Sequence, residues 1–543
     1  MFTGESEVCH MSFRTNPSQQ ITMIDSLWGL TPREQKALEN SWAKVFAEDI
    51  FPNIDEQRFA VLYSDKDSRP NTPVNLMVGS MILKELFDLS DDEMVETLML
   101  DLRFQYALHT TSFKEQPLSD KSLTRFRRRC YDYETTHGVD LYKDCVTDLS
   151  ASLAKLMKID GRIRRMDSTM IEANIRKLSR MELLYTCIAK LVRYLAKNAQ
   201  HIDLEGLEHY NDPNDYNRVI YHSRSKEVDE RMLTLLNDAD KLFELCGAAF
   251  DEVTEYQLFV RCISEQTIVE DSVRRLKTKE DGGMDSSLIQ NPSDPEATYR
   301  VKAGKAHRGY VTNVEESVGE NGSIITSYDV RTNNTSDCEM LQDHLQNMDT
   351  QEETVSMTVD GAYASVENIE LAASKNVELI PTDLTGQETD PIMGKFELTE
   401  DGTKVLKCPA GHEPKSCSFD KRTKQCHVSF LRDHCTDCPF KDQCKPKVYK
   451  RVAKKTVSSK SIVRAQVREK MKTEQYKLMA RIRNGVETIP SLLKNQYHAN
   501  EMPVHGLQRT KFFIGSKIGA INFQKIFRFR KGTGNYAQNP VFC

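Results

Sequence analysis

The first 150 residues or so have the apolar spacing of helices. An apolar run from Val74 to Leu89 precedes Ser90 and Glu93, which have the spacing of a helix-capping box. A later predicted helix has Leu123 on its apolar face and carries a cluster of arginines, namely Arg125, Arg127, Arg128 and Arg129. Two short helices followed by a basic one are typical of a helix-turn-helix-like DNA contact, although an ordinary solvated face explains the arginines equally well.

The pattern then changes twice. Residues 163–171 alternate as a strand does, and helical spacing returns in Leu184, Ile188, Leu191 and Leu195. A second long helical stretch is predicted from about Val228 to Lys277. We therefore expect a helical insertion at about 175–280, followed by a loop over 281–303 that contains Gly and Pro.

Strands and helices alternate after this loop. Residues 309–314 and 323–328 flank a Gly-rich turn and predict a hairpin. A helix (336–348), a strand (355–360), a helix (365–374) and a strand (377–381) follow, and the last 90 residues return to helix, with Ile482, Val486, Ile489 and Leu493 on one face. This order predicts an α+β or α/β fold with a mixed sheet.

Composition and charge narrow the class of protein. Of 543 residues, 28% are charged and 39% hydrophobic, which excludes a disordered chain and a membrane protein. Because Met1 to Asn16 has no apolar core, it is not a secretory signal, and we expect a cytoplasmic protein with no membrane partner. The formal net charge is −6, but residues 401–543 have 30 basic and 10 acidic side chains, whereas the first 400 have 44 and 70. This asymmetry favours a nucleic-acid partner for the basic part; a basic surface docked on an acidic one is the alternative.

Three acids have positions that suit metal-dependent chemistry. Asp167 lies in one predicted strand, Asp360 ends another, and Glu487 lies on a C-terminal helix. Carboxylates that converge in this way can hold two Mg²⁺ ions, about 3.5–4 Å apart, for phosphodiester displacement. Arg483 and Lys494 share a helix face with Glu487 and would grip phosphates. Taken singly, each acid is more often a surface residue, and the cations are often an ion-pair stripe.

The cysteines predict a second metal site. Of 14 Cys, six lie between Cys408 and Cys444, and without a signal peptide such a cluster favours a metal over disulfides. Cys435 and Cys438 have knuckle spacing, and Cys408 and Cys444 complete a Cys₄ set for a structural Zn²⁺. Other side chains compete as ligands, namely Cys417, Cys426, His412 and His434. Free cysteines in a basic loop are the remaining alternative.

With these motifs the chain resembles the bacterial insertion-sequence DDE transposases, most closely the branch numbered eleven-eighty-two. The matching segments, in chain order, are Leu62–Ser64, Arg69–Pro70 with Pro73, Leu89–Glu93, Ser122–Arg127, Met166–Asn174, Asp294–Ala297, Gly309–Tyr310, Val359–Tyr363 and Arg483-x₃-Glu487-x₆-Lys494. The family's signature usually has a Tyr three positions before the Arg, where this chain has Ala480, and the nearest Tyr is Tyr476. Pro490, one turn after Glu487, is also unusual and should kink the helix.

The resemblance implies an RNase H-like core whose catalytic acids are Asp167, Asp360 and Glu487, with two Mg²⁺ (or Mn²⁺) ions. It implies nicking at transposon ends, followed by attack of the freed 3′-hydroxyl on target DNA. The same branch carries Cys408, Cys435, Cys438 and Cys444, which favours these four as the Zn²⁺ ligands. The implied partner is double-stranded DNA, as terminal inverted repeats and target, bound by a dimer that is associated with the bacterial nucleoid.

The expected domains follow from these assignments. They are a helical DNA-binding domain (1–150), the first part of an RNase H-like core with its helical insertion (151–400), a Cys-rich zinc insertion (401–450) and a C-terminal helical part of the core that carries Glu487 (451–543). Two alternatives are a non-catalytic, domesticated DNA-binding protein and an RNase H-like nuclease without strand transfer. A metal-binding scaffold is a further alternative, but it leaves the matches around the acids unexplained.

Overall fold

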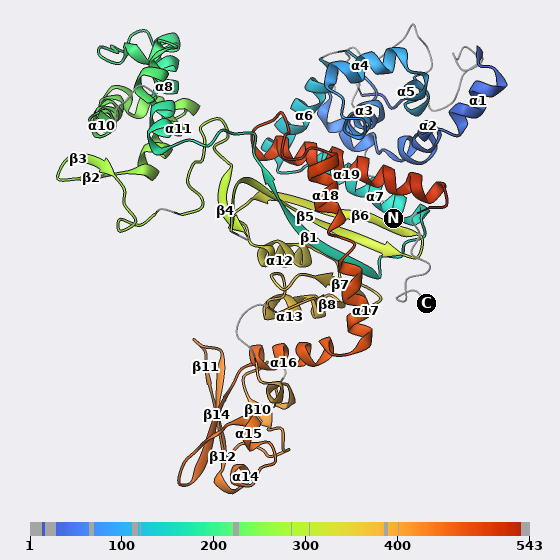
Figure 1. Cartoon of the computed structure of the whole chain (residues 1–543), viewed down its shortest axis with the longest axis vertical. Coiled ribbons are helices and arrows are strands. Elements are labelled where there is room, and N and C mark those ends of the chain that lie inside the picture. Colours follow the sequence, from blue (N-terminus) through green and yellow to red (C-terminus); the bar gives the residue numbers. More distant parts are fainter. Residues whose placement is uncertain are drawn as a thin grey trace, which may run out of the picture.

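A computed structural model of the chain has a central sheet, helical groups on two sides and a small sheet domain at one end (Figure 1). It describes residues 13–16, 29–64, 70–110, 118–119, 121–220, 227–283, 285–302, 304–384, 389–399 and 401–533. Most of Met1–Asn16, together with Arg69 of the resemblance, lies outside these ranges.

The N-terminal segment is helical, as its pattern predicts. Its α-helices are α1 (Pro32–Glu39), α2 (Trp42–Val45), α3 (Val74–Leu86), α4 (Asp91–Leu100), α5 (Leu102–Ala107), α6 (Ser122–His137) and α7 (Leu141–Leu156), with tighter or wider turns at Phe46–Ile50, Phe51–Asn53 and Gln57–Leu62. The predicted capping box is present, because the Ser90 hydroxyl accepts from Glu93 N and the Glu93 carboxylate accepts from Ser90 N. These helices share one hydrophobic core with the sheet and the last helix, α19 (Leu507–Arg530).

The central sheet is mixed, which confirms the predicted class. Its strands are β1 (Ile163–Glu172), β4 (Thr298–Lys302), β5 (Lys305–Gly319), β6 (Gly322–Thr332), β7 (Val355–Val359) and β8 (Val377–Pro381). Both β4 and β6 pair with β5, and the order continues through β1 and β7 to β8. β1 is antiparallel to β5 but parallel to β7, and α12 (Asp337–Asn347) and α13 (Val366–Ser374) connect the later strands. This arrangement is consistent with an RNase H-like core.

The insertion between β1 and β4 has a hydrophobic core of its own. It consists of α8 (Arg180–Asn198), α9 (Asp215–Ile220), α10 (Val228–Cys246), α11 (Thr254–Gln266) and the hairpin of β2 (Thr267–Glu270) and β3 (Val273–Leu276), with short turns at Glu208–Asn211 and Gly247–Phe250. The single helical stretch predicted from Val228 to Lys277 is therefore wrong. Gly247 interrupts it at a φ of +54°, and Asp271 and Ser272, both at positive φ, form the two-residue hairpin turn. The loop predicted over 281–303 is also wrong in part, since it contains β4.

The basic C-terminal part begins with a small sheet domain. Its elements are a short turn (Pro391–Lys395), β9 (Glu397–Leu398), β10 (Val405–Lys407), β11 (Ser416–Asp420), β12 (Gln425–Leu431), α14 (Arg432–Thr436), α15 (Lys441–Cys444), β13 (Lys447–Val448) and β14 (Val452–Val457). The four-stranded sheet has the order β11-β12-β14-β13. A small core that includes Val428 and Phe430 supports it.

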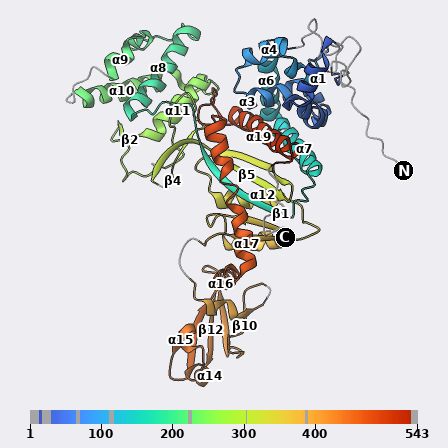
Figure 2. The same ribbon diagram turned by 45° about the vertical axis from the view of Figure 1, so that its right-hand side comes forward.

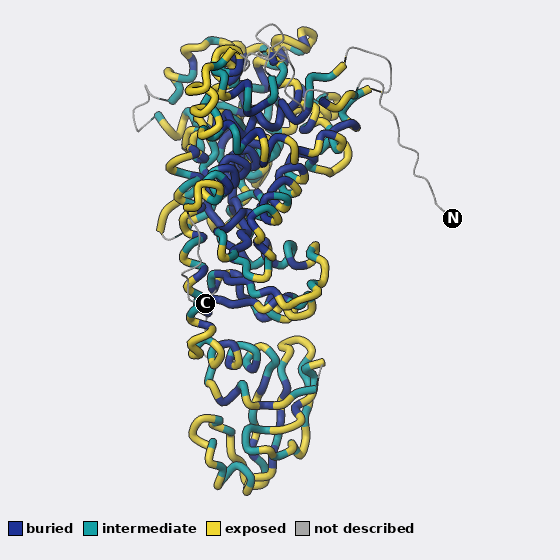
Figure 3. Tube along the Cα trace, turned by 90° about the vertical axis from the view of Figure 1, so that its right-hand side faces the viewer, coloured by how far each residue is buried: buried dark blue, intermediate teal, exposed yellow. Residues whose placement is uncertain are grey.

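A helical column connects this domain to the central sheet (Figure 2). It consists of α16 (Ser459–Met471), α17 (Glu474–Arg483), α18 (Thr488–Ser491) and a wider turn at Leu492–Gln496. α17 packs against β1, β7 and β8, and Ile482, Val486, Ile489 and Leu493 are all buried, as their common face predicts. Buried residues are concentrated in the central body (Figure 3). Among the described residues, no helix combines the length and apolar character needed to span a membrane.

Candidate active site

Asp167 and Asp360 lie on adjacent parallel strands. The register of β1 and β7 pairs Ile163 with Ser356 and Arg165 with Thr358. Extending this register by two residues brings Asp360 beside Asp167, on the same face of the sheet. The carboxylate of Asp360 accepts a hydrogen bond from Gly361 N at 2.7 Å, which fixes its direction at the end of β7. The two aspartates are therefore neighbours, as the sequence predicts.

Arg483 joins the third acid to the first. Its Nη2 lies 3.4 Å from Asp167 Oδ2, and its Nη1 lies 3.3 Å from Glu487 Oε1. The Arg483 side chain is 13% exposed and that of Asp167 15%, whereas Glu487 is 62% exposed. The Nε of Arg483 is buried and has no hydrogen-bond partner among the described residues. One guanidinium thus connects two of the three predicted acids and keeps a donor for a further group.

The helix predicted around Glu487 is interrupted. α17 ends at Arg483, and α18 begins at Thr488 with Glu487 as its N-cap residue. Pro490 lies in the first turn of α18, where backbone N–H groups have no helical partner, so this proline is compatible with a helix start. The interruption precedes Glu487 and is not a kink at Pro490. Lys494 follows in the wider turn at Leu492–Gln496.

Arg165 fills the space at this interruption. Its Nη1 donates to the carbonyl oxygen of Ile482 at 2.8 Å, and its guanidinium lies where a Cβ on Gly485 would be. On its other side, Arg165 Nε donates to buried Glu316 of β5, which also pairs with Lys525 of α19. A charged network that includes Glu316 of β5 and Lys525 of α19 therefore holds Arg165 against the end of α17.

Basic side chains surround the acids. Burial raises the pKa of the Asp167 carboxyl and Asp360 adds to this rise, whereas Arg483 and Lys302 act in the opposite direction. Burial lowers the pKa of Lys494, which also interacts with Lys302 and with Glu172. The sequence pattern missed Lys302 and Arg165. The alternation of Arg165 and Asp167 on one strand face was the available signal for Arg165, but Lys302 lies in a segment predicted as a loop.

The three acids are chemically suitable ligands for a hard divalent cation. Among the described residues, no three His, Cys, Asp or Glu side chains, the clustered cysteines included, are gathered tightly enough to hold an ion. However, a cationic group of the protein already lies between Asp167 and Glu487, which shows that this position accepts positive charge. Carboxylate oxygens are also the donors that Mg²⁺ prefers. The donor set fits the metal that the resemblance implies.

Four of the six clustered cysteines lie together. Cys408, Cys435, Cys438 and Cys444 line one cavity of about 20 Å³. Burial raises the pKa of Cys435 to about 11, and the three other thiols contribute to the rise. His434 lines the same cavity with His412 stacked on it, at 4.1 Å between ring centroids.

The remaining two cysteines of the cluster lie in a neighbouring part of the small domain. Cys417 is on β11 and Cys426 on β12, and the two thiols interact with each other. The structure therefore separates these two competitors from the predicted set of four.

The four arginines of α6 have different environments. Arg127 is half-buried and its Nη1 donates to Asp91 at 3.1 Å, while the guanidinium of Arg129 lies 4.7 Å from the ring centroid of Tyr63. Arg128 is 82% exposed, and Arg125 is also exposed. Two of the four are thus available to a partner, and two are engaged within the domain. Tyr476 is engaged as well, because its hydroxyl donates to the carbonyl oxygen of Pro381 at 2.9 Å.

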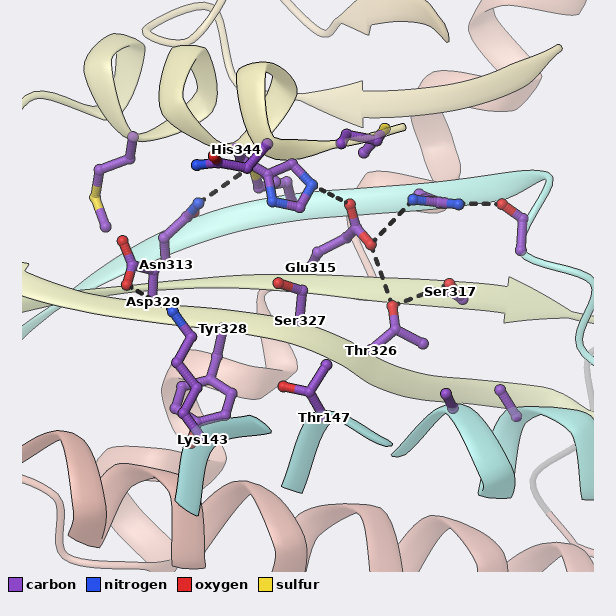
Figure 4. A pocket seen from close by; sticks show the side chains of 18 of the residues that line it. Lys143, Thr147, Asn313, Glu315, Ser317, Thr326, Ser327, Tyr328, Asp329 and His344 are labelled. Atoms are coloured by element: carbon purple, nitrogen blue, oxygen red, sulfur yellow. Dashed lines mark hydrogen bonds and ion pairs between the residues drawn. The ribbon is translucent and has the colours of Figure 1, made fainter. Parts of the chain in front are cut away.

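A polar cavity of about 870 Å³ lies on the opposite face of the sheet, between α7, β5, β6 and α12 (Figure 4). Arg164 and Met166 line it, so Arg165 and Asp167 point the other way. Most of its charges are paired, for example Lys143 Nζ at 3.0 Å from Asp329 and His344 Nε2 at 2.8 Å from Glu315. This pairing indicates a structural role and leaves the three acids as the candidate site.

Comparisons with known proteins match two separate parts of the chain. Residues 34–129 match a family described as a transposase domain (DUF772), and residues 407–527 match a family described as a transposase DDE domain. No curated protein matches the chain. A solved structure described as a piggyBac transposase synaptic complex with hairpin DNA is 11% identical, with a TM-score of 0.22, and the match covers 69% of this chain and 71% of that chain. The first helices are thus similar to the DUF772 family, and the segment around Glu487 is similar to the transposase DDE domain family.

Proposed function

We propose that this protein is a DNA transposase of the branch that its motifs resemble. It would hydrolyse the phosphodiester bond at transposon ends and join the freed 3′-hydroxyl to target DNA. The observation that carries the proposal is that Arg483 connects Asp167, beside Asp360 on the mixed sheet, with Glu487. Arg483 and Glu487 lie within the segment that matches a transposase DDE domain.

Asp167, Asp360 and Glu487 are the residues that would hold two Mg²⁺ (or Mn²⁺) ions. When bound, such ions activate the attacking oxygen and stabilise the leaving oxygen. The chain's own cations bind and orient the DNA strand. The Nε of Arg483, which has no partner among the described residues, can donate to a phosphate oxygen. Lys302, which acts on Asp167, and Lys494, which acts on Glu172, supply positive charge near β1. Binding of the anion would draw the Arg483 guanidinium away from the carboxylates.

The four cysteines Cys408, Cys435, Cys438 and Cys444 would hold a structural Zn²⁺. Four thiolates leave no open position for substrate, so the ion would stabilise the small domain. The common cavity of these four thiols supports the assignment.

The proposed transposase function implies double-stranded DNA as the partner. Exposed Arg125 and Arg128 are available to the terminal inverted repeats, whereas Arg127 pairs with Asp91 and Arg129 lies over the ring of Tyr63. Because two transposon ends must be brought together, we expect a dimer on DNA.

The test is a cleavage and joining assay with purified protein, Mg²⁺ and a duplex carrying the DNA that flanks the coding sequence. A transposase gives both nicked ends and products joined to unrelated DNA. Nicked ends without joined products would indicate a nuclease, and DNA binding without either product would indicate a non-catalytic DNA-binding protein.

A further inference from the structure

The outer face of the small sheet is polar on all four strands. The register aligns two rows across it: Ser418, His427 and Thr456 form one, and Ser416, Ser429, Lys454 and Lys447 form the other. The intervening residues of β12, such as Val428 and Phe430, point inward to the core. This face therefore presents hydroxyl and ammonium groups side by side, while its back supports the fold.

These rows line an open groove of about 480 Å³. The lining includes Lys445, Lys447, Lys454 and Lys455 but no carboxylate from the described part of the chain. Within the same described ranges, Lys447 and Lys454 are exposed and form no ion pair. The nearby Asp420 is occupied at the end of β11, where it accepts from the backbone N–H of Arg422 at 2.8 Å.

The lysines of the groove do not all have the same role. Lys455 points inward and donates to the carbonyl oxygen of Cys444, next to the cysteine cavity. Lys454 points outward, and its Nζ lies 5.6 Å from the ring centroid of exposed Tyr449. Lys447 is its partner across the strands. Lys447 and Lys454 are thus a facing pair of cations that the fold presents to solvent at this groove, and exposed Lys445 adds a third charge to the lining.

We propose that this groove binds the sugar–phosphate backbone of duplex DNA without reading its sequence, at a place separate from the three acids. The proposal rests on the proposed function and adds a second contact to it. The groove lies in the domain at the far end of the helical column from the N-terminal helices (Figure 1). With acids on the central sheet and cations on this distal face, the elongated molecule can hold DNA at the point of cleavage and at a second place along the duplex.

The side chains of the groove favour phosphate over base edges. Lysine ammonium and serine or threonine hydroxyl groups bind phosphate oxygens and fix the position of a protein on DNA. Arg, Asn and Gln, whose planar groups form pairs of hydrogen bonds with base edges, do not line the groove in the described structure. Affinity at this surface should therefore depend on salt and not on sequence.

The test compares two double variants with equal loss of charge. Lys447→Gln/Lys454→Gln alters the groove, whereas Lys421→Gln/Arg422→Gln alters the exposed β11–β12 turn of the same domain. Binding of the full-length chain is measured with the flanking-sequence duplex and with an unrelated duplex over a range of salt concentrations. We expect the groove variant to bind both duplexes about tenfold or more weakly and to lower the salt slope by about 2, roughly one per lost contact. The turn variant should change much less.

Three results would overturn the inference: equal effects of the two variants, unchanged binding by the groove variant, or a loss confined to the flanking-sequence duplex. The last would show that the groove reads sequence. Cleavage is measured in parallel to separate this inference from the proposed function. If the wild-type chain cleaves DNA but the groove variant binds normally, only the groove is rejected. If the groove variant loses affinity but no chain cleaves, only the catalytic proposal is rejected.

Discussion

Gly485 has no room for a Cβ atom, because the guanidinium of Arg165 occupies the space where one would lie. Arg165 uses this space to donate to the carbonyl oxygen of Ile482, in the last turn of α17, just before the interruption that separates α17 from α18. Glu487 is the N-cap residue of α18. The contact from Arg165 of β1 therefore helps to set the position of this third acid. The glycine links the strand of the first acid to the position of the third.

Replacing Gly485 with Ala should therefore displace either Arg165 or the start of α18. We expect a loss of about 1–3 kcal/mol in the free energy of unfolding, the usual cost of overpacking a filled site. Mg²⁺-dependent cleavage should fall as well, because Glu487 moves. Urea unfolding and the cleavage assay measure the two effects. Gly29→Ala is the control, since nothing lies within 4 Å of a Cβ there. Wild-type behaviour of Gly485→Ala would show that Arg165 does not hold this interruption.

Arg483→Gln should reduce cleavage by about 100-fold, because a cationic donor to the reacting phosphate is lost. Arg483→Lys keeps the charge but not the Nε donor, and we expect an intermediate rate. Arg481→Gln is a matched control on the same helix, since Arg481 is exposed. Single-turnover cleavage at saturating DNA distinguishes a slower chemical step from weaker binding. Equal rates for the Arg483 and Arg481 variants would remove Arg483 from the site.

The cysteine cavity predicts about one Zn²⁺ per purified chain. Cys435→Ser should lose the metal and lower the melting temperature of the small domain. Cys417→Ser should keep the metal, because Cys417 interacts with Cys426 on the neighbouring strand and does not line the cavity. Metal content by elemental analysis checks both variants. A wild-type protein without zinc, or loss of zinc in both variants, would contradict the assignment of these four ligands.

Glu315 should make the fold sensitive to acid. Burial alone would raise its pKa, but His344, Arg164 and Thr326 outweigh burial and lower the pKa to about 2 from an ordinary value of 4.5. Because the folded state holds the charged form, the stability that Glu315 contributes is full above pH 4.5 and is lost as the pH falls towards 2. The difference in unfolding free energy between wild type and Glu315→Gln, on the order of 2–3 kcal/mol at neutral pH, should shrink over that range. The same difference for exposed Glu352→Gln should be small and flat, and a flat curve for Glu315→Gln would reject the prediction.

The strands and both aspartates could be predicted from the sequence, because their signals are local. Alternation marks β1, and a turn between two β-rich runs marks the hairpin of β5 and β6. The parallel register then places Asp360 beside Asp167. The four thiols that share a cavity were favoured by the resemblance to the transposase branch, because spacing alone left Cys417, Cys426, His412 and His434 as competing ligands.

Other features depend on contacts between distant segments and have no local signal. The interruption at Gly485 requires Arg165, which lies more than 300 positions earlier in the chain. Helical spacing continued through residues 267–276, where two residues of positive φ form a hairpin turn instead. The local sequence does not distinguish Arg127 from the exposed arginines beside it. Its different environment comes from Asp91, a residue of another helix, to which it donates a hydrogen bond.

The most direct test of the account measures Mg²⁺-dependent cleavage and DNA binding together, for the wild-type chain and for Asp167→Asn, Asp360→Asn and Glu487→Gln. Each substitution should abolish cleavage while DNA is still bound. Glu474→Gln, at the exposed start of α17, should cleave as the wild type does. Cleavage at the wild-type rate by any of the three acid variants would contradict the assignment of that residue, and normal cleavage by all three would contradict the catalytic site.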